Sequence, residues 1–204
     1  VIVSEYKRAR KLLLVLDSAY HVLSLQLFDY LVALKEQGLR LEGGPITPAA
    51  AAFAPLLGGF RSVDHPDEAD ADSFNPFGSF NPRGVIDFDW AQSIEPASDT
   101  TAPRTYAVRV RKDGQISDVD KSDALTGPAF HAMLAHMRGR IGELIDRWLD
   151  GDIAVRPAYH RDRLPCSTCP FADVCRFEAG RDPVNRLDTL GRLEVVNRLN
   201  ETAT

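Results

Sequence analysis

The chain has 204 residues, of which 44% are hydrophobic and 26% are charged, as in an ordinary globular domain. Its formal net charge of −5 argues against a polycation that coats nucleic acid, although a local basic groove is compatible with that sum. No apolar run reaches the roughly 18 residues of a membrane-spanning helix, and the first residues do not form a secretory signal. We therefore expect a cytoplasmic protein with one domain and no membrane partner.

The first part of the chain predicts a strand, a helix and an ambiguous segment. "VIVSEYK", residues 1–7, alternates apolar and polar side chains and is rich in β-branched residues, as strands are. Residues 19–37 carry leucines at helical spacing, and Gly38 follows as a natural helix end. Residues 48–57 contain a run of four alanines that favours helix, but a proline near each end allows only a short element.

The remainder predicts a long loop, a hairpin and a long helix. Residues 58–84 are rich in Gly, Pro, Asn, Asp and Ser, which predicts a loop-rich insertion, and "VIDFDW" next to it predicts a short strand or a helix start. "RTYAVRVR" and "QISDV" flank "KDG", which predicts a β-hairpin with Gly114 in its turn. Residues 128–149 predict the clearest helix, and we expect its apolar stripe to be core: Phe130, Met133, Leu134, Met137, Ile141, Leu144, Ile145 and Trp148. Strands and helices without strict alternation indicate an α/β or α+β fold.

All three cysteines of the chain lie within ten positions of one another, spaced C-x2-C-x5-C at Cys166, Cys169 and Cys175. In a reducing compartment such clustering favours a metal over disulfides, because two thiolates three residues apart can bind one metal from a single turn. Three ligands leave a tetrahedral zinc or an iron–sulfur cluster one short. His160 is the nearest fourth ligand and would give a Cys3His zinc site. The alternatives are an iron–sulfur cluster whose fourth cysteine is absent, and three reduced cysteines without metal.

Two residue pairs near the start carry side chains suited to phosphodiester chemistry. Glu5 and Lys7 are two apart on the predicted strand, so both point to one face while Tyr6 points to the other. A carboxylate and the Tyr6 carbonyl can bind Mg²⁺, and a lysine can orient or help to deprotonate an attacking water. Gln26 and Tyr30 lie at i and i+4 on one helix face, where they can hydrogen-bond a phosphate or a metal-bound water. In isolation the simpler explanations are favoured, namely an exposed ion pair on the strand and a polar pair in a helix seam.

The order of these motifs resembles a known family. E-Y-K on a strand, Q-x-x-x-Y within "LSLQLFDYL" and a terminal C-x2-C-x5-C resemble the iron–sulfur nucleases of the PD-(D/E)XK superfamily. The nearest likeness is to the C-terminal nuclease domain of AddB, a component of bacterial AddAB helicase–nucleases, and CRISPR-associated exonucleases are similarly arranged. The likeness continues through "YAVRVRKDG", the long helix and "LDGDIAVRP", and so covers most of the chain. It implies a restriction-endonuclease-like α/β core, with "PAAAAF" as a strand and a cysteine-rich tail over residues 160–180.

The resemblance also implies a role for each residue of the early motifs. Glu5 would be a Mg²⁺ ligand together with the backbone carbonyl of Tyr6, and Lys7 would be the catalytic lysine. Gln26 and Tyr30 would position the scissile phosphate or other groups of the active site. The cysteines would hold three irons of a [4Fe–4S] cluster: Cys166, Cys169 and Cys175.

In the resembled family a further aspartate and the fourth cysteine of the cluster precede the E-x-K strand. We therefore expect residues 1–204 to be the C-terminal portion of such a nuclease domain, with little activity on its own. The expected function is that of a fragment of a Mg²⁺-dependent DNA exonuclease. It would belong to a helicase–nuclease complex with a partner subunit, in double-strand-break repair by homologous recombination. A stand-alone Cys3His zinc-binding interaction module and a non-catalytic DNA-binding remnant are the alternatives.

Overall fold

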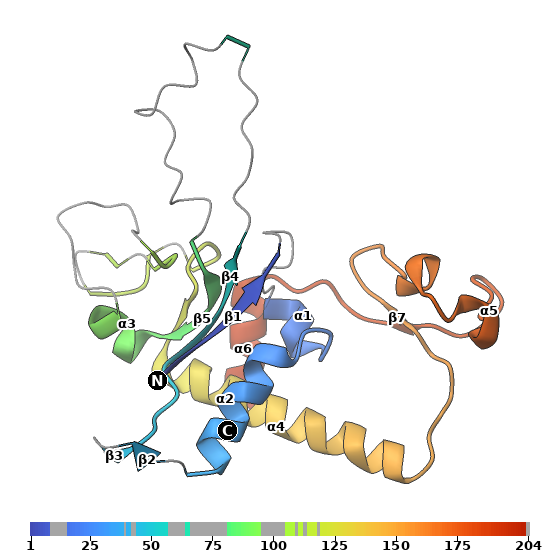
Figure 1. Ribbon diagram of the computed structural model, residues 1–204, viewed down its shortest axis with the longest axis horizontal. Coiled ribbons are helices and arrows are strands. Elements are labelled where there is room, and N and C mark those ends of the chain that lie inside the picture. The colour runs from blue at the N-terminus through green and yellow to red at the C-terminus, as the bar shows by residue number, and fades with distance from the viewer. Residues whose placement is uncertain are drawn as a thin grey trace.

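A four-stranded mixed sheet forms the centre of the computed structural model, with helices on both faces (Figure 1). The structure describes residues 1–8, 16–38, 40–41, 44–56, 64–65, 81–94, 105–108, 110–111, 114–117 and 119–202. Along the sheet the strands are β1 (Ile2–Lys7), β4 (Ala50–Pro55), β5 (Arg83–Asp87) and β6 (Ala124–Leu125). The pair β1–β4 is parallel, β4–β5 antiparallel and β5–β6 parallel. This is the mixed α/β architecture that the sequence predicts.

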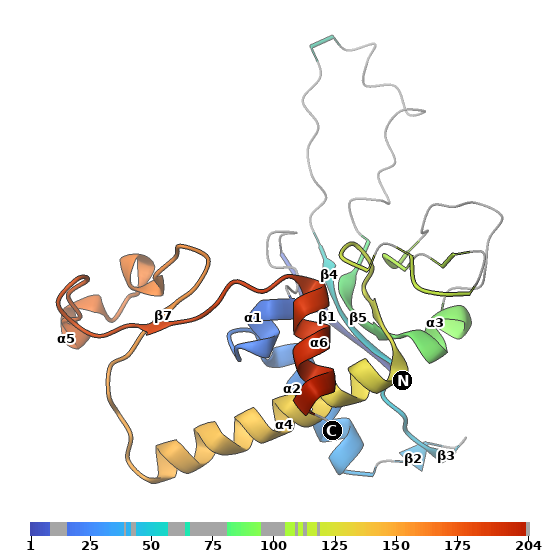
Figure 2. The ribbon, with the colours of Figure 1, turned by 180° about the vertical axis from the view of Figure 1, so that it is seen from behind.

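The helices divide the core into a large and a small cluster. The large cluster joins one face of the sheet to α1 (Leu16–Tyr20), α2 (Gln26–Glu36), α4 (Gly127–Leu149) and α6 (Arg192–Thr202). The small cluster packs α3 (Phe88–Ile94) against the other face of β4 and β5. Figure 2 shows α6 crossing α4 on the side of the sheet that also carries α2.

The remaining elements are short and lie around this centre. Two-stranded pairs are formed by β2 (Arg40–Leu41) with β3 (Gly44–Pro45), and by β7 (Ala158–Tyr159) with β8 (Asn185–Arg186). Residues 157–187, here called the cysteine loop, run from β7 to β8 through a 3₁₀ turn, Pro165–Thr168, and helix α5, Ala172–Cys175. The cysteine loop projects away from the sheet (Figures 1 and 2).

Strand β4 confirms the strand that the family resemblance implies for "PAAAAF". Its residues from Ala50 to Phe53 are buried, because helices cover the sheet on both faces. Small side chains let the neighbouring strand approach: a Cβ on Gly84 of β5 would overlap the Ala51 carbonyl oxygen and lie 2.6 Å from Ala52 Cα. Tertiary packing therefore outweighs the helix propensity of four consecutive alanines.

The predicted helix over residues 19–37 is wrong as a single element. Helix α1 ends at Tyr20, and α2 begins at Gln26 after a turn in which Val22 adopts a left-handed φ of 62°. The amides of Val22 and Leu23 still bond back to α1, but the following residues cannot continue it past a left-handed position. Gly38, with a φ of +56°, ends the second helix as predicted.

The long helix confirms its predicted bounds to within one residue, but its apolar stripe is core over only half its length. The first half is buried against the sheet, α2 and α6. In the distal half Leu144, Ile145 and Trp148 are exposed, Trp148 to 72% of its surface. The expectation that the entire stripe is core is wrong, because no element among the described residues covers the distal turns.

Two further predictions are answered in part. Residues 58–63 and 66–80 of the predicted insertion lie outside the described residues, and residues 83–84 belong to β5 instead. "VIDFDW" supplies both the end of β5 and the start of α3. In the predicted hairpin Val110 and Ile116 form an isolated antiparallel bridge, with Gly114 at a φ of +81°.

In the portion of the chain that the structure describes, no helix is both long enough and apolar enough to cross a membrane.

The close approach of β4 and β5 predicts that Gly84→Ala destabilises the fold. The new methyl group meets backbone atoms that cannot move aside, so we expect a loss of about 3 kcal/mol in the free energy of unfolding. Gly142→Ala in α4 is the matched control, since a Cβ there meets nothing within 4 Å. It should add about 0.5–1 kcal/mol, because alanine favours helix. Urea unfolding measures both, and equal effects would contradict the assigned strand contact.

Candidate active site

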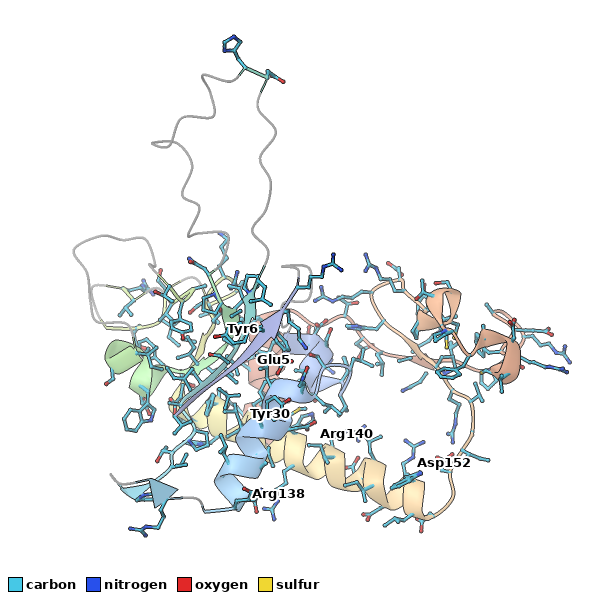
Figure 3. The ribbon with its side chains drawn as sticks, viewed as in Figure 1. Glu5, Tyr6, Tyr30, Arg138, Arg140 and Asp152 are labelled. Atoms are coloured by element: carbon cyan, nitrogen blue, oxygen red, sulfur yellow. The ribbon has the colours of Figure 1, made fainter. Side chains whose placement is uncertain are left out.

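Strand β1 and helix α2 bring the four predicted active-site side chains together. Glu5 and Lys7 share the face of β1 that is turned to α2, and each side chain is 24% exposed. Tyr6 points to the opposite face and is largely exposed. Because α2 begins at Gln26, this residue and Tyr30 lie one turn apart beside the strand (Figure 3).

The side-chain amide of Gln26 links the two charged groups. Lys7 Nζ donates to Glu5 Oε1 at 3.1 Å and to Gln26 Oε1 at 2.7 Å. Gln26 Nε2 donates to Glu5 Oε1 at 2.9 Å and to the Tyr30 hydroxyl at 3.2 Å. An amide offers an acceptor to the ammonium and a donor to the carboxylate at the same time. The structure thus assembles the four residues, while their catalytic roles stay predictions.

Phe53 is a fifth member of this group, which the sequence analysis missed. It is the register partner of Glu5 on β4, and its ring centroid lies 4.9 Å from Lys7 Nζ. The ring is buried, so it presents an apolar, electron-rich face to the ammonium and excludes water from that side. The signal that could have found it is a single aromatic residue within a run of alanines on the neighbouring strand.

The backbone carbonyl of Tyr6 points to the open edge of β1. The carbonyls of Val1 and Lys7 accept the amides of Ala49 and Leu56, at 2.9 and 2.8 Å, and therefore point towards β4. Even-numbered carbonyls point the other way, because the hydrogen-bonding groups of a strand alternate between its two edges. The described residues place no strand on that edge, so no strand among them pairs with the Tyr6 carbonyl.

The oxygen donors at β1 suit a hard cation but do not complete its coordination. Mg²⁺ prefers carboxylate and carbonyl oxygens and usually completes its six positions with water and substrate phosphates. Within the described ranges, no three His, Cys, Asp or Glu residues are grouped so that they could hold a metal ion. Glu5 and the Tyr6 carbonyl therefore fit two positions of such an ion, and the other ligands must have a different source.

The three cysteines lie on neighbouring turns of the cysteine loop. Cys166 is in the 3₁₀ turn and its carbonyl accepts the Cys169 amide at 3.3 Å, while Cys175 ends α5. All three are free thiols, and Cys175 is exposed. Short C-x2-C turns of this kind suit thiolate ligation of a metal. The fit is partial, because the described residues neither bring the three thiols together into a group that could hold a metal ion nor place a fourth ligand beside them.

His160 has a partner of its own. Its Nε2 lies 3.0 Å from Asp17 Oδ2, and the side chain is 8% exposed. A zinc ion bound at Nε2 would have to displace this buried carboxylate. Nδ1 stays available, since a metal-bound imidazole commonly donates its other N–H to a carboxylate, so the contact does not decide against the Cys3His zinc site.

Asp29 on α2 is a buried polar group that the sequence analysis also missed. Its Oδ1 is buried without a hydrogen-bond partner in the described part of the chain. Removal of the carboxyl group from water raises its pKa above the ordinary value, because burial disfavours the charged form.

Comparisons with known proteins identify the family to which the chain belongs. Residues 1–176 match the family model described as the PD-(D/E)XK nuclease superfamily. The chain belongs to the PD-(D/E)XK nuclease superfamily. Its mixed sheet and helical cover therefore represent the restriction-endonuclease-like fold that the motifs imply.

Similar curated proteins are named as subunits of an ATP-dependent helicase/deoxyribonuclease. The one from Symbiobacterium thermophilum is 28% identical over 202 residues, which cover 97% of this chain and 17% of that protein. The one from Bacillus pumilus is 25% identical over 179 residues, which cover 85% of this chain and 15% of that protein. The chain thus spans about a sixth of the length of these relatives.

The raised pKa of Asp29 predicts that Asp29→Asn stabilises the fold at neutral pH. The folded state binds the Asp29 proton more tightly than the unfolded chain, so this group's contribution to stability falls as pH rises above the ordinary carboxyl value of about 4. The amide removes the charge penalty, so we expect a gain in the free energy of unfolding at pH 7 that shrinks towards pH 4. Urea unfolding across this range measures it. Asp146→Asn, at an exposed position of α4, is the control, and an equal gain there would refute the explanation.

Proposed function

We propose that this chain contributes half of the active centre of a magnesium-dependent DNA nuclease. The observation that carries the proposal is the Gln26 amide, which joins the Glu5 carboxylate and the Lys7 ammonium beside the open edge of β1. Membership of the nuclease superfamily and relatives that are named helicase/deoxyribonuclease subunits support it.

In this mechanism Lys7 is the proton-handling group. An ammonium has three N–H donors, and Lys7 uses two of them on Glu5 and Gln26, which leaves one for a water or a phosphate oxygen. Phe53 shields one side of the ammonium, so the remaining donor is directed to the accessible side. Tyr30 holds the amide of Gln26 in the orientation that Lys7 requires. Glu5 and the Tyr6 carbonyl would hold Mg²⁺, which when bound polarises the phosphoryl oxygen and acidifies its water.

The cysteine loop has a structural part in the proposal. Cys166, Cys169 and Cys175 would hold three irons of a [4Fe–4S] cluster, with the fourth ligand from outside the described residues. Because metal binding to such a loop contributes folding free energy, the cluster would act as a staple rather than as an electron carrier. Free thiols on two successive turns support this assignment.

The cellular role follows from the relatives and is part of the same proposal. Their names describe them as subunits, so we infer a partner subunit and a DNA substrate for the parent of this domain. The reaction would be exonucleolytic processing of DNA ends for recombination repair, in the cytoplasm, where reducing conditions keep the thiols free.

The catalytic proposal predicts that cleavage depends on Glu5 and Lys7 in a polypeptide that supplies a second acidic ligand ahead of β1. Glu5→Gln and Lys7→Ala should each lower Mg²⁺-dependent cleavage of linear DNA by about 10²–10⁴-fold, because each removes a metal ligand or a proton-transfer group. Gln26→Ala should have a smaller effect, because it only loosens their geometry. Glu143→Gln, in an exposed ion pair of α4, is the control and should leave the rate unchanged.

The 204-residue chain alone should cleave DNA poorly, since one carboxylate rarely holds a catalytic Mg²⁺. Robust cleavage by this chain would contradict the inference that further ligands are needed. DNA binding without cleavage in the extended polypeptide, unaffected by Glu5→Gln, would favour the non-catalytic DNA-binding alternative.

The cysteine assignment predicts iron and sulfide in protein that is purified without oxygen. Visible absorbance and elemental analysis should show an iron–sulfur cluster, and Cys169→Ser should lower its occupancy. His160→Asn should retain iron and sulfide, with a smaller loss than Cys169→Ser, because His160 contacts Asp17 and is not a ligand of the proposed cluster. A colourless protein with stoichiometric zinc that is lost in His160→Asn would instead establish the Cys3His module.

A further inference from the structure

The cysteine loop is joined to helix α1 by a buried ionic contact that neither the active centre nor the metal chemistry uses. Asp17 Oδ2 lies 3.0 Å from His160 Nε2, 3.0 Å from Arg161 Nε and 2.9 Å from Arg161 Nη2. The Asp17 side chain is 1% exposed. Two consecutive residues of the loop therefore contact one carboxylate that precedes them by more than 140 positions.

The burial of Asp17 distinguishes this contact from the other ion pairs near the loop. Asp152 lies just beyond the distal end of α4 (Figure 3) and pairs with Arg147 and Arg156, but its side chain is 25% exposed and both arginines are half exposed. A pair of that kind contributes little, because water competes for both charges. A buried carboxylate must keep its partners, since the loss of either leaves a charge without compensation.

The backbone at Arg161 shows that the contact determines the local conformation. Arg161 and Asp162 adopt φ values of 50° and 56°, a left-handed pair that a tight turn usually fills with Asn-Gly. His160 and Arg163 close this turn with two backbone hydrogen bonds, at 3.1 and 3.0 Å. Strain of this kind persists only where surrounding contacts enforce it, and the Arg161–Asp17 contact supplies that enforcement.

Helix α1 also holds the chain where it leaves the loop. His21, directly after α1, has its Nε2 2.9 Å from the carbonyl oxygen of Asp188. The carbonyl oxygen of Tyr20 lies 2.9 Å from His136 Nε2, and the two rings stack at 4.5 Å, which ties α1 to α4. Both ends of the cysteine loop are therefore fixed to one short helix that stands between β1 and α2 in the sequence.

We infer that Asp17 is a positioning residue: it holds the cysteine loop on α1 without any metal and so sets the place of the three cysteines relative to β1 and α2. Only the purpose of this placement, the binding of an iron–sulfur cluster, rests on the proposed function. The placement itself requires the carboxylate of Asp17 and its two partners, His160 and Arg161.

Amide hydrogen exchange of the metal-free, full 204-residue chain tests the inference. Asp17→Asn keeps the shape of the side chain but removes its charge. The amides of His160 and Arg163, which close the turn, should then exchange about 10-fold faster or more, because the turn opens locally. Amides in the buried half of α4 should keep their protection, which shows that the core is folded.

Two further variants separate positioning from general destabilisation. Asp152→Asn removes a comparable but exposed charge near the loop and should leave the His160 and Arg163 amides unchanged. Arg161→Gln should accelerate the same two amides, and its combination with Asp17→Asn should be no worse than Asp17→Asn alone. That lack of additivity is expected only if the two residues act through each other.

Unchanged exchange at both amides in Asp17→Asn, with the α4 amides still protected, would overturn the inference. So would fully additive effects in the double variant. If Asp17→Asn unfolds the chain, exposed Arg161 allows the same measurement in Arg161→Gln, where unchanged exchange again refutes it. The exchange rates are measured without DNA cleavage and without iron. A failure of the proposed nuclease function can therefore be distinguished from a failure of this inference.

Discussion

The amide of Gln26 is the contact on which the candidate active site depends. Glu5 and Lys7 come from one strand, and a carboxylate and an ammonium two residues apart would form a simple pair without a third group. Gln26 contacts both of them because it presents oxygen to Lys7 and nitrogen to Glu5. A charged side chain at this position would attract one partner and repel the other. The neutral amide therefore fixes the geometry of both groups while leaving their charges available to a substrate.

This contact requires α2 to begin at Gln26, and that requirement explains the break after α1. If residues 16–36 formed one continuous helix, α2 would keep the direction of α1. The left-handed Val22 lets the chain change direction, and the amides of Val22 and Leu23 close the end of α1. A valine in that conformation is costly, since its branched side chain crowds the backbone. The side chain of Val22 packs against the large cluster of the core, and this burial offsets part of the cost.

The sequence predicted what depends on local spacing and missed what depends on packing. The alternation of β1 placed Glu5 and Lys7 on one face, and a spacing of four placed Gln26 beside Tyr30, since both follow from backbone geometry. The turn at Val22 has no glycine to mark it, and Phe53 joins the site only because β4 pairs with β1 in register. In α4, periodicity shows that an apolar side exists but not what covers it, so exposed Trp148 could not be foreseen. The alanine strand was found through family resemblance, because its own propensity favours helix.

The contacts around Gln26 and the contacts around Asp17 differ in how far they are buried, and this difference suits the position of each. Around Gln26 the charged groups are only partly buried, so water, an ion or a phosphate can reach them, and the hydrogen bonds can rearrange when one arrives. At Asp17 the carboxylate is sealed from solvent and its partners are fixed, because in a low-dielectric site each lost partner is costly. If the network at the cysteine loop were exposed, it would hold the loop less firmly. If the network at β1 were fully buried, substrate could not reach it. The rigid contact lies on α1 and the open centre lies between β1 and α2, the elements that precede and follow α1 in the chain.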